Sequence, residues 1–358
     1  MLRAAANYGY LNAKIRALRS RQLSEQDRHF LLAAKELTAF LSYLGTTSYG
    51  SYLPDPAKGA PGLPALERQL SRPLMQDYAK VAHSLRGHRE RNIIIALFRR
   101  FEAENLKLVL RAMSANLGRE DVSHLLYPLG RLSDLNWDAL WAAKTLPELL
   151  AHLRPGVFGQ SLAHALPQFE AQGRLFPLEM ALDFSCFRYL QEAVQHLGSR
   201  HDRRAAEKVL GPYIDILNIS WVIRLKTVYG LSPEETVNYT LPEGDLVTLA
   251  CLSQLARAED IATFISHLPP VFQQEVHAVN HWQSIGFRLQ GWFVKILARV
   301  FAGPPFHIGV AIAYLLEKEI ELTSLITMLQ GRAQNLSVEE IGKKLPEQVT
   351  EVAYVQTG

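Results

Sequence analysis

The stretch "ENLKLVLRAMSANLGREDV" (residues 104–122) decides the fold, because a closely similar pattern returns twice along the chain. The later copies are "LNISWVIRLKTVYGLSPEET" (217–236) and "TSLITMLQGRAQNLSVEEI" (323–341). Apolar residues recur at steps of three and four, the period of an α-helix with one buried face. Each copy ends in "LGRED", "LSPEE" or "LSVEE", where Gly or Ser followed by acids predicts a helix stop and a new N-cap.

Polar residues also recur at matching positions in each copy and just before it. In each copy an acid is followed three residues later by Asn or Ser, and six residues after that by a third polar residue. The first copy has Glu102, Asn105 and Arg111, the second has Asp215, Asn218 and Arg224, and the third has Glu321, Ser324 and Gln330. Residues three apart share a helix face, so the acid and the Asn are neighbours. A buried Asn is costly unless its amide is hydrogen-bonded, which favours a structural clamp between helices. A ligand or ion site built in triplicate is the alternative.

A second segment repeats in the same order as the long helices. Its copies are "AKELTAFLSYL" (34–44), "AKTLPELLAHL" (143–153) and "AEDIATFISHL" (258–268). The period of about 110 residues is too long for a solenoid repeat. No stretch sustains the period-two alternation of a strand. We therefore predict an all-α chain of three homologous helical-bundle domains, at residues 1–132, 133–246 and 247–358. The Pro-rich stretch 53–64 is expected to be an exposed loop in the first domain.

The composition is that of an ordinary globular protein. The chain is 48% hydrophobic and 20% charged, and its net charge of +3 is weak evidence for an acidic partner. Two cysteines, Cys186 and Cys251, cannot form a disulfide framework, which favours a reducing compartment. The longest nearly apolar run, 306–316, is well short of the roughly 18 residues that a membrane span needs.

Catalytic and metal-binding patterns are weak. No phosphate-cradling loop is present, so no nucleotide cofactor is expected. His277 and His281 have the spacing of two ligands on one helix face, but no further ligands accompany them, and ordinary histidines are the favoured interpretation. Cys186 lies between aromatic residues, as a small buried hydrophobe does. We predict no catalytic residue, no metal site and no cofactor.

The first predicted helix is basic. In "YLNAKIRALRSRQL" (10–23), Leu11, Ile15 and Leu18 share one side, and basic residues surround the rest. Packing within residues 1–132 is the favoured interpretation. A helix on a membrane surface and a nucleic-acid contact are the alternatives.

Taken together, these patterns resemble the C subunit of bacterial and archaeal V/A-type rotary ATPases, the counterpart of the d subunit in the eukaryotic vacuolar enzyme. The opening "YGYLNAKIRALRSRQL" (8–23) is similar to the N-terminal motif of that family. The motif is carried by Tyr8, Tyr10, Asn12, Lys14, Arg16 and Ser20. The recurring acid-x-x-Asn helices match at Glu102 and Asn105 and at Asp215 and Asn218, whereas Ser324 replaces the usual Asn in the third copy.

The resemblance implies a non-catalytic part of a central stalk. Members of that family form a funnel of three helical domains around a pseudo-threefold axis. It accepts a coiled-coil axle subunit, with a small companion subunit, and rests on the cytoplasmic loops of a membrane proteolipid ring. The expected location is thus the cytoplasmic face of a membrane, without a membrane span or a nucleic-acid partner. A free-standing helical scaffold is the main alternative, and a nucleic-acid binder rests only on the mild basicity.

Overall fold

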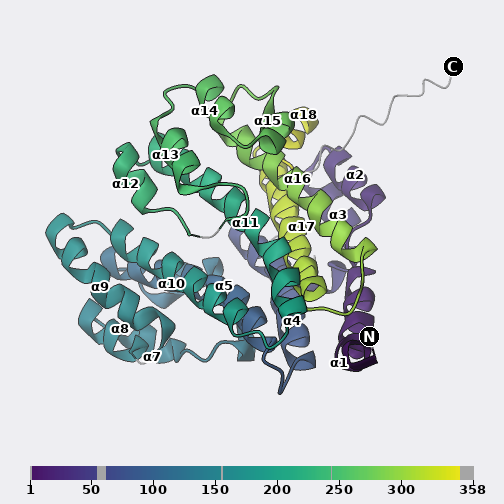
Figure 1. The fold of residues 1–358 in the computed structure, drawn as a ribbon, viewed down its shortest axis with the longest axis horizontal. Helices are drawn as coiled ribbons and strands as arrows, with labels where there is room; N and C mark the ends of the chain where they lie inside the picture. The colour runs from purple at the N-terminus through teal and green to yellow at the C-terminus, as the bar shows by residue number, and fades with distance from the viewer. Residues whose placement is uncertain (1, 55–61, 155, 243, 347–358) are drawn as a thin grey trace. The chain divides into compact units, whose positions relative to one another are not determined.

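The computed structural model describes residues 2–54, 62–154, 156–242 and 244–346, with side chains described from residue 8 onward (Figure 1). Across these residues the chain forms helices joined by turns and loops, and it has no strand. The predicted all-α class is therefore confirmed. In the same residues, no helix is both long enough and apolar enough to cross a membrane.

Internal contacts divide the chain into two compact units. The terminal unit combines Met1–Ser51 with the described residues from Arg204 onward, and the middle unit is Tyr52–Arg203. The N-terminal helices thus belong with the C-terminal ones. The three homologous domains at 1–132, 133–246 and 247–358 remain a prediction.

The middle unit contains three helices of 20 residues or more, α4 (Leu63–Ser84), α5 (Arg91–Ser114) and α10 (Phe176–Gln195), and several shorter ones. The shorter helices are α6 (Arg119–Val122), α7 (Trp137–Ala142), α8 (Leu146–Leu153) and α9 (Val157–Gln172), with 3-10 turns at Ser123–Leu125 and Gly130–Leu132. The predicted loop 53–64 falls partly outside the described residues, which omit 55–61. It also ends earlier than expected, since α4 begins at Leu63 with a proline in its first turn.

The core of the middle unit forms where α5 meets α10 and the pair α7–α8. Leu106 and Val109 of α5 pack with Leu149 of α8 and Leu182 of α10 in one buried cluster. Cys186 lies in the same cluster and is 1% exposed, so its predicted role as a buried hydrophobe is confirmed. Burial also raises the pKa of its thiol well above the ordinary range, which keeps it unreactive.

The terminal unit is built from both ends of the chain. Its helices are α1 (Leu2–Arg19), α2 (Glu25–Ala33), α3 (Leu37–Leu44), most of α11 (Arg200–Thr227), α12 (Pro233–Asn238), α13 (Leu249–Arg257), α14 (Ile261–His267), α15 (Pro270–Val276), α16 (Trp282–Ala302), α17 (Gly309–Ala333) and α18 (Val338–Gly342). A 3-10 turn, η1 (Gly50–Tyr52), lies where the chain passes from the terminal unit into the middle one.

Helix α17 is central to the terminal unit. Every residue from Gly309 to Leu316 is buried, as expected of a helix that is apolar on all sides. Helices α1, α3, α16 and α18 contact it. Helix α1, whose Leu11, Ile15 and Leu18 are buried, contacts α17, which lies outside residues 1–132, where the sequence predicts that α1 packs. Periodicity identifies the face that a helix buries but does not identify the helix that covers it.

Candidate functional site

In the middle unit, Asn105 of α5 clamps a loop. Its side-chain Nδ2 donates to the carbonyl of Tyr127 at 3.0 Å, and its Oδ1 accepts the N–H of the same residue at 2.8 Å. The amide of this buried side chain therefore satisfies both backbone groups of one loop residue. The clamped segment is a loop rather than a helix, and it precedes the pair α7–α8.

Glu102 lies one turn before Asn105 and is 2% exposed. Arg99 donates to it from Nη1 at 3.2 Å, and the Ser133 side chain also hydrogen-bonds to it. Burial raises the pKa of Glu102, against the lowering effect of Ser133 and Arg99. The acid thus holds the segment just before Asn136, whose side chain caps α7.

In the terminal unit, Asn218 of α11 repeats this arrangement. Its Nδ2 donates to the carbonyl of Leu241 at 2.8 Å, and its Oδ1 accepts the N–H of Leu241 at 2.7 Å. The clamped residue lies 23 positions after the Asn, compared with 22 for Asn105 and Tyr127. The two copies therefore share one local geometry, as their common sequence pattern would require if they arose by duplication.

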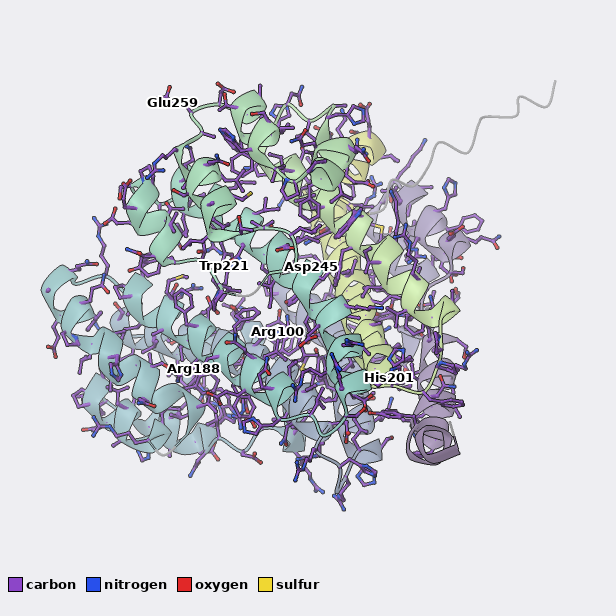
Figure 2. The ribbon with its side chains drawn as sticks, in the orientation of Figure 1. Arg100, Arg188, His201, Trp221, Asp245 and Glu259 are labelled. Atoms are coloured by element: carbon purple, nitrogen blue, oxygen red, sulfur yellow. The ribbon has the colours of Figure 1, made fainter. Side chains whose placement is uncertain are left out.

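Asp215, one turn before Asn218, is fully buried and accepts three backbone hydrogen bonds. The donors are the N–H groups of Asp245, Leu246 and Val247, at 3.1, 2.8 and 3.0 Å. Figure 2 labels Asp245 in this loop. Burial raises the pKa of Asp215, and the three hydrogen bonds oppose that rise. The loop leads into Thr248, whose side chain caps α13.

The third acid, Glu321 of α17, holds the start of the chain. It accepts the N–H of Leu23 at 2.8 Å and the hydroxyl of Tyr49 at 2.8 Å, and Lys318 also donates to it. Leu23 precedes Ser24, which caps α2 through a capping box. Each of the three acids therefore secures the segment that leads into a helix pair: α7–α8, α13–α14 and α2–α3. A further bond runs from Arg332 of α17 to the carbonyl of Leu32 in α2.

The remaining repeated positions do not share one arrangement. Arg111 forms a bidentate pair with Glu179 of α10 at 2.7 and 3.0 Å, and Arg224 lies over the ring of Tyr229 on the surface. Gln330 is half-buried in α17. Ser324 is half-buried and lines a pocket, where the other copies have the clamping Asn.

The ends of the three long helices are alike. A residue in the left-handed conformation follows each helix: Asn116 (φ 52°), Gly230 (φ 62°) and Asn335 (φ 56°). The short helices α6, α12 and α18 begin directly afterwards with N-caps at Gly118, Ser232 and Ser337. The predicted helix stop and new N-cap are thus confirmed in all three copies.

The N-terminal motif does not form a single site. Tyr8 is buried, Tyr10 is 66% exposed, and Asn12 and Lys14 are half-buried on α1. Arg16 and Ser20 are exposed at the end of the helix, where both line the same pocket as Ser324. Tyr10, Arg16 and Ser20 are therefore the residues of the motif that are open to solvent, and the last two line a pocket.

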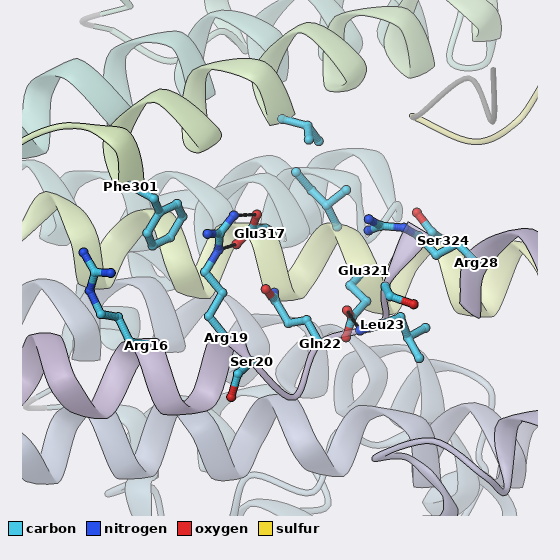
Figure 3. A pocket seen from close by; sticks show the side chains of 13 residues that line it. Arg16, Arg19, Ser20, Gln22, Leu23, Arg28, Phe301, Glu317, Glu321 and Ser324 are labelled. Atoms are coloured by element: carbon cyan, nitrogen blue, oxygen red, sulfur yellow. Dashed lines mark hydrogen bonds and ion pairs between the residues drawn. The ribbon is translucent and has the colours of Figure 1, made fainter. Parts of the chain in front are cut away.

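The pocket has a volume of about 470 Å³ and is formed by the terminal unit alone. Figure 3 shows that Arg16 and Arg19 reach it from α1, Arg28 from α2, and Glu317 and Glu321 from α17. Arg19 donates to Glu317 from Nε at 2.9 Å and from Nη2 at 3.0 Å, and it also lies 3.9 Å from the centre of the Phe301 ring. The sequence did not predict this pocket; Ser324, which stands where the other two copies have Asn, lies in its wall.

The histidines considered as metal ligands lie between helices. His277 follows the end of α15 and His281 precedes α16, so the two do not share a helix face as their spacing suggested. His277 Nδ1 lies 2.7 Å from the carbonyl of Gln274. Within the described part of the chain, no group of three or more His, Cys, Asp or Glu residues could hold a metal ion.

Comparison with known proteins gives a consistent result. The family described as ATP synthase (C/AC39) subunit matches residues 11–344. The C subunit of the A-type ATP synthase of Methanothermobacter thermautotrophicus is 27% identical over 91% of this chain and 84% of its own length. That of Methanocaldococcus jannaschii is 24% identical over 94% and 85%, and that of Halorubrum lacusprofundi is 23% identical over 95% and 98%.

Proposed function

Because the chain belongs to the ATP synthase (C/AC39) subunit family, we propose that it is the non-catalytic socket in the central stalk of a V/A-type rotary ATPase. In this role it accepts the coiled-coil axle subunit, with a small companion subunit, and rests on the cytoplasmic loops of the proteolipid ring. It passes torque between the axle and the ring during transport of H⁺ or Na⁺. The observation that carries the proposal is the family match over residues 11–344.

The construction of the long helices supports a mechanical role. A torque-transmitting part must deform little, and close-packed helices with satisfied buried polar groups meet that requirement. Glu102, Asp215 and Glu321 each hold a neighbouring segment of the chain through hydrogen bonds. Because these carboxylates are engaged with the chain itself, we assign them to holding helices in place and place catalysis in other subunits of the complex.

The cyclic order of the three acid contacts supports a three-part body. Each long helix secures the segment before a helix pair, and the third secures the first pair of the chain. A linear array would leave its last helix without such a pair. This order supports the proposed division of the chain into three similar parts, the last of which combines both ends of the chain.

The test is to purify membranes that carry a tagged copy of the chain. A socket should co-purify with the proteolipid ring and the axle subunit. Deletion of the chain should abolish ATP-driven ion transport, whereas the catalytic part, released from the membrane, should still hydrolyse ATP. If the tagged chain is recovered without these partners, the free-standing scaffold becomes the better description. Binding to nucleic acid that weakens steeply with salt would instead favour the nucleic-acid alternative.

A further inference from the structure

The pocket beside Ser324 lies where the third long helix departs from the other two. Asn105 and Asn218 each fill the corresponding position with an amide that bonds a loop backbone. Ser324 has a shorter side chain, and the pocket of about 470 Å³ lies against it. The third copy therefore lacks the Asn clamp of the other two, and a concave surface of the size of a ligand pocket lies at this position.

The pocket carries more positive charge than its own acids neutralise. Glu317 is paired with Arg19, and Glu321 with Lys318, Tyr49 and the Leu23 N–H. Arg16 is exposed and has no ion pair among the residues that the structure describes. Its guanidinium is thus available to a carboxylate from outside.

The two glutamates also limit which anion the pocket can take. Glu317 and Glu321 both line it, so a phosphate dianion placed there would be close to two carboxylates. A single carboxylate placed beside Arg16 avoids most of that repulsion. The charge pattern therefore favours a carboxylate over a phosphate group.

Part of the lining is apolar, beside the polar side chains of Ser20, Gln22, Ser24 and Ser324. Val294 of α16 and Ile320 of α17 contribute to the wall, together with Leu23. The volume is larger than one Asp or Glu side chain requires, and an apolar wall is better covered by apolar atoms than by water. The occupant should therefore combine a carboxylate with an adjacent apolar group.

We propose that this pocket is a docking site for an acidic segment of a neighbouring subunit, which places a carboxylate beside Arg16 and an apolar side chain against Val294 and Ile320. The inference rests on the proposed function, because it requires the chain to be held in a multi-subunit complex. The pocket would give one of the three similar parts of the chain a contact with the neighbouring subunit that the other two parts lack. A unique contact fixes the rotational position of a partner on a body whose other parts are alike.

The experiment measures rebinding of the chain to the rotary complex. Detergent-solubilised complex is stripped of this protein, and purified chain is added back at about 150 mM salt, a physiological ionic strength. Arg16→Glu should raise the Kd about tenfold, because it places a carboxylate against the incoming one. Arg21→Glu is the matched control. It reverses a charge on the same segment, at an exposed residue outside the pocket, and should change the Kd less than about threefold.

A second measurement identifies the occupant. A photo-reactive phenylalanine analogue at Ser20, which lines the pocket, should cross-link in the assembled complex to an Asp- or Glu-containing peptide of another subunit. The same group at Ala13, on α1 outside the pocket, should not give that product. Failure to obtain the Ser20 product, or equal losses for Arg16→Glu and Arg21→Glu, would overturn the docking site. Failure of the unaltered chain to rebind would instead refute the proposed function, and this inference with it.

Discussion

The backbone N–H of Leu23 donates to the carboxylate of Glu321 at 2.8 Å, although 298 positions separate the two residues. The bond joins the segment between α1 and α2 to the last long helix, α17. In the other two copies, the acid holds a segment that follows it by about 30 residues: Glu102 holds Ser133, and Asp215 holds residues 245–247. The third copy of the arrangement is thus assembled from both ends of the chain, which makes Glu321 a link between the two terminal regions.

Replacing Glu321 with Ala should destabilise the terminal unit strongly. The change leaves Lys318, 4% exposed, without its carboxylate and removes the acceptor of both Leu23 and Tyr49. Loss of one partner from a buried ion pair costs about 3–5 kcal/mol. Urea unfolding followed by circular dichroism measures the effect. Glu339→Ala, which removes a surface pair with Lys343, is the control and should cost less than about 1 kcal/mol. Equal effects of the two variants would contradict the role given to Glu321.

The sequence was sufficient to predict the helices but not the pairing of their ends. The periodicity of the stretch 104–122 correctly predicted the second half of α5, and the repeated stops correctly predicted the N-caps at Gly118, Ser232 and Ser337. These features depend on local interactions, so neighbouring residues are enough to indicate them. Helix pairs and long helices alternate along the chain, however, and that order does not show whether a pair belongs with the long helix before or after it.

The candidate site was predictable only in part. The repeated acids and Asn residues were visible as polar positions in apolar stripes, which is a strong indication that they are hydrogen-bonded. Their partners are backbone groups of loops, and backbone groups leave no residue-specific signal. The pocket depends on α1 lying against α17. Since the contact joins opposite ends of the chain, the basic helix alone gave no indication of it.

The two Asn clamps should be more sensitive to truncation than the third position. Asn218→Ala leaves the buried N–H and carbonyl of Leu241 without partners, which should lower the free energy of unfolding by about 2–3 kcal/mol. Asn105→Ala should have a similar effect through Tyr127. Ser324→Ala should change it by less than about 1 kcal/mol, because Ser324 lines an open pocket. Urea unfolding of the three variants makes the comparison. A large loss for Ser324→Ala would show that the third position also acts as a clamp.

Gly244 should tolerate no side chain. A Cβ atom at this position would overlap Oδ1 of Asp215, within the loop that donates three N–H groups to that carboxylate. Gly244→Ala should therefore destabilise the protein by about 3 kcal/mol, since the loop must move and lose hydrogen bonds. Gly9→Ala is the control, because nothing lies within 4 Å of its added Cβ in α1. It should stabilise the helix by up to about 1 kcal/mol. A neutral Gly244→Ala variant in thermal unfolding would refute the tight contact.

Titration of Asp183 should lower the stability of the protein as pH rises from about 4 to 6, relative to a chain in which this residue cannot titrate. Asp183 of α10 accepts a hydrogen bond from Lys107 of α5 at 2.6 Å. Burial raises the pKa of Asp183 from 3.8 to about 6, although Lys107 lowers it. In this pH window the unfolded chain has released a proton that the folded chain keeps, so the folded state loses stability as pH rises. The shift corresponds to at most about 3 kcal/mol.

Urea unfolding at several pH values tests this origin of the slope. Asp183→Asn cannot titrate and should flatten the decline across the same pH window, whatever its effect on stability at a single pH. Asp138→Asn is the control, since the Asp138 side chain is 87% exposed and pairs with Arg119 on the surface. It should leave the slope unchanged. If the stability of Asp183→Asn falls with pH as steeply as that of the unaltered chain, another group takes up the proton. Glu102 and Asp215 are then the next residues to examine, because both are buried and have raised pKa values.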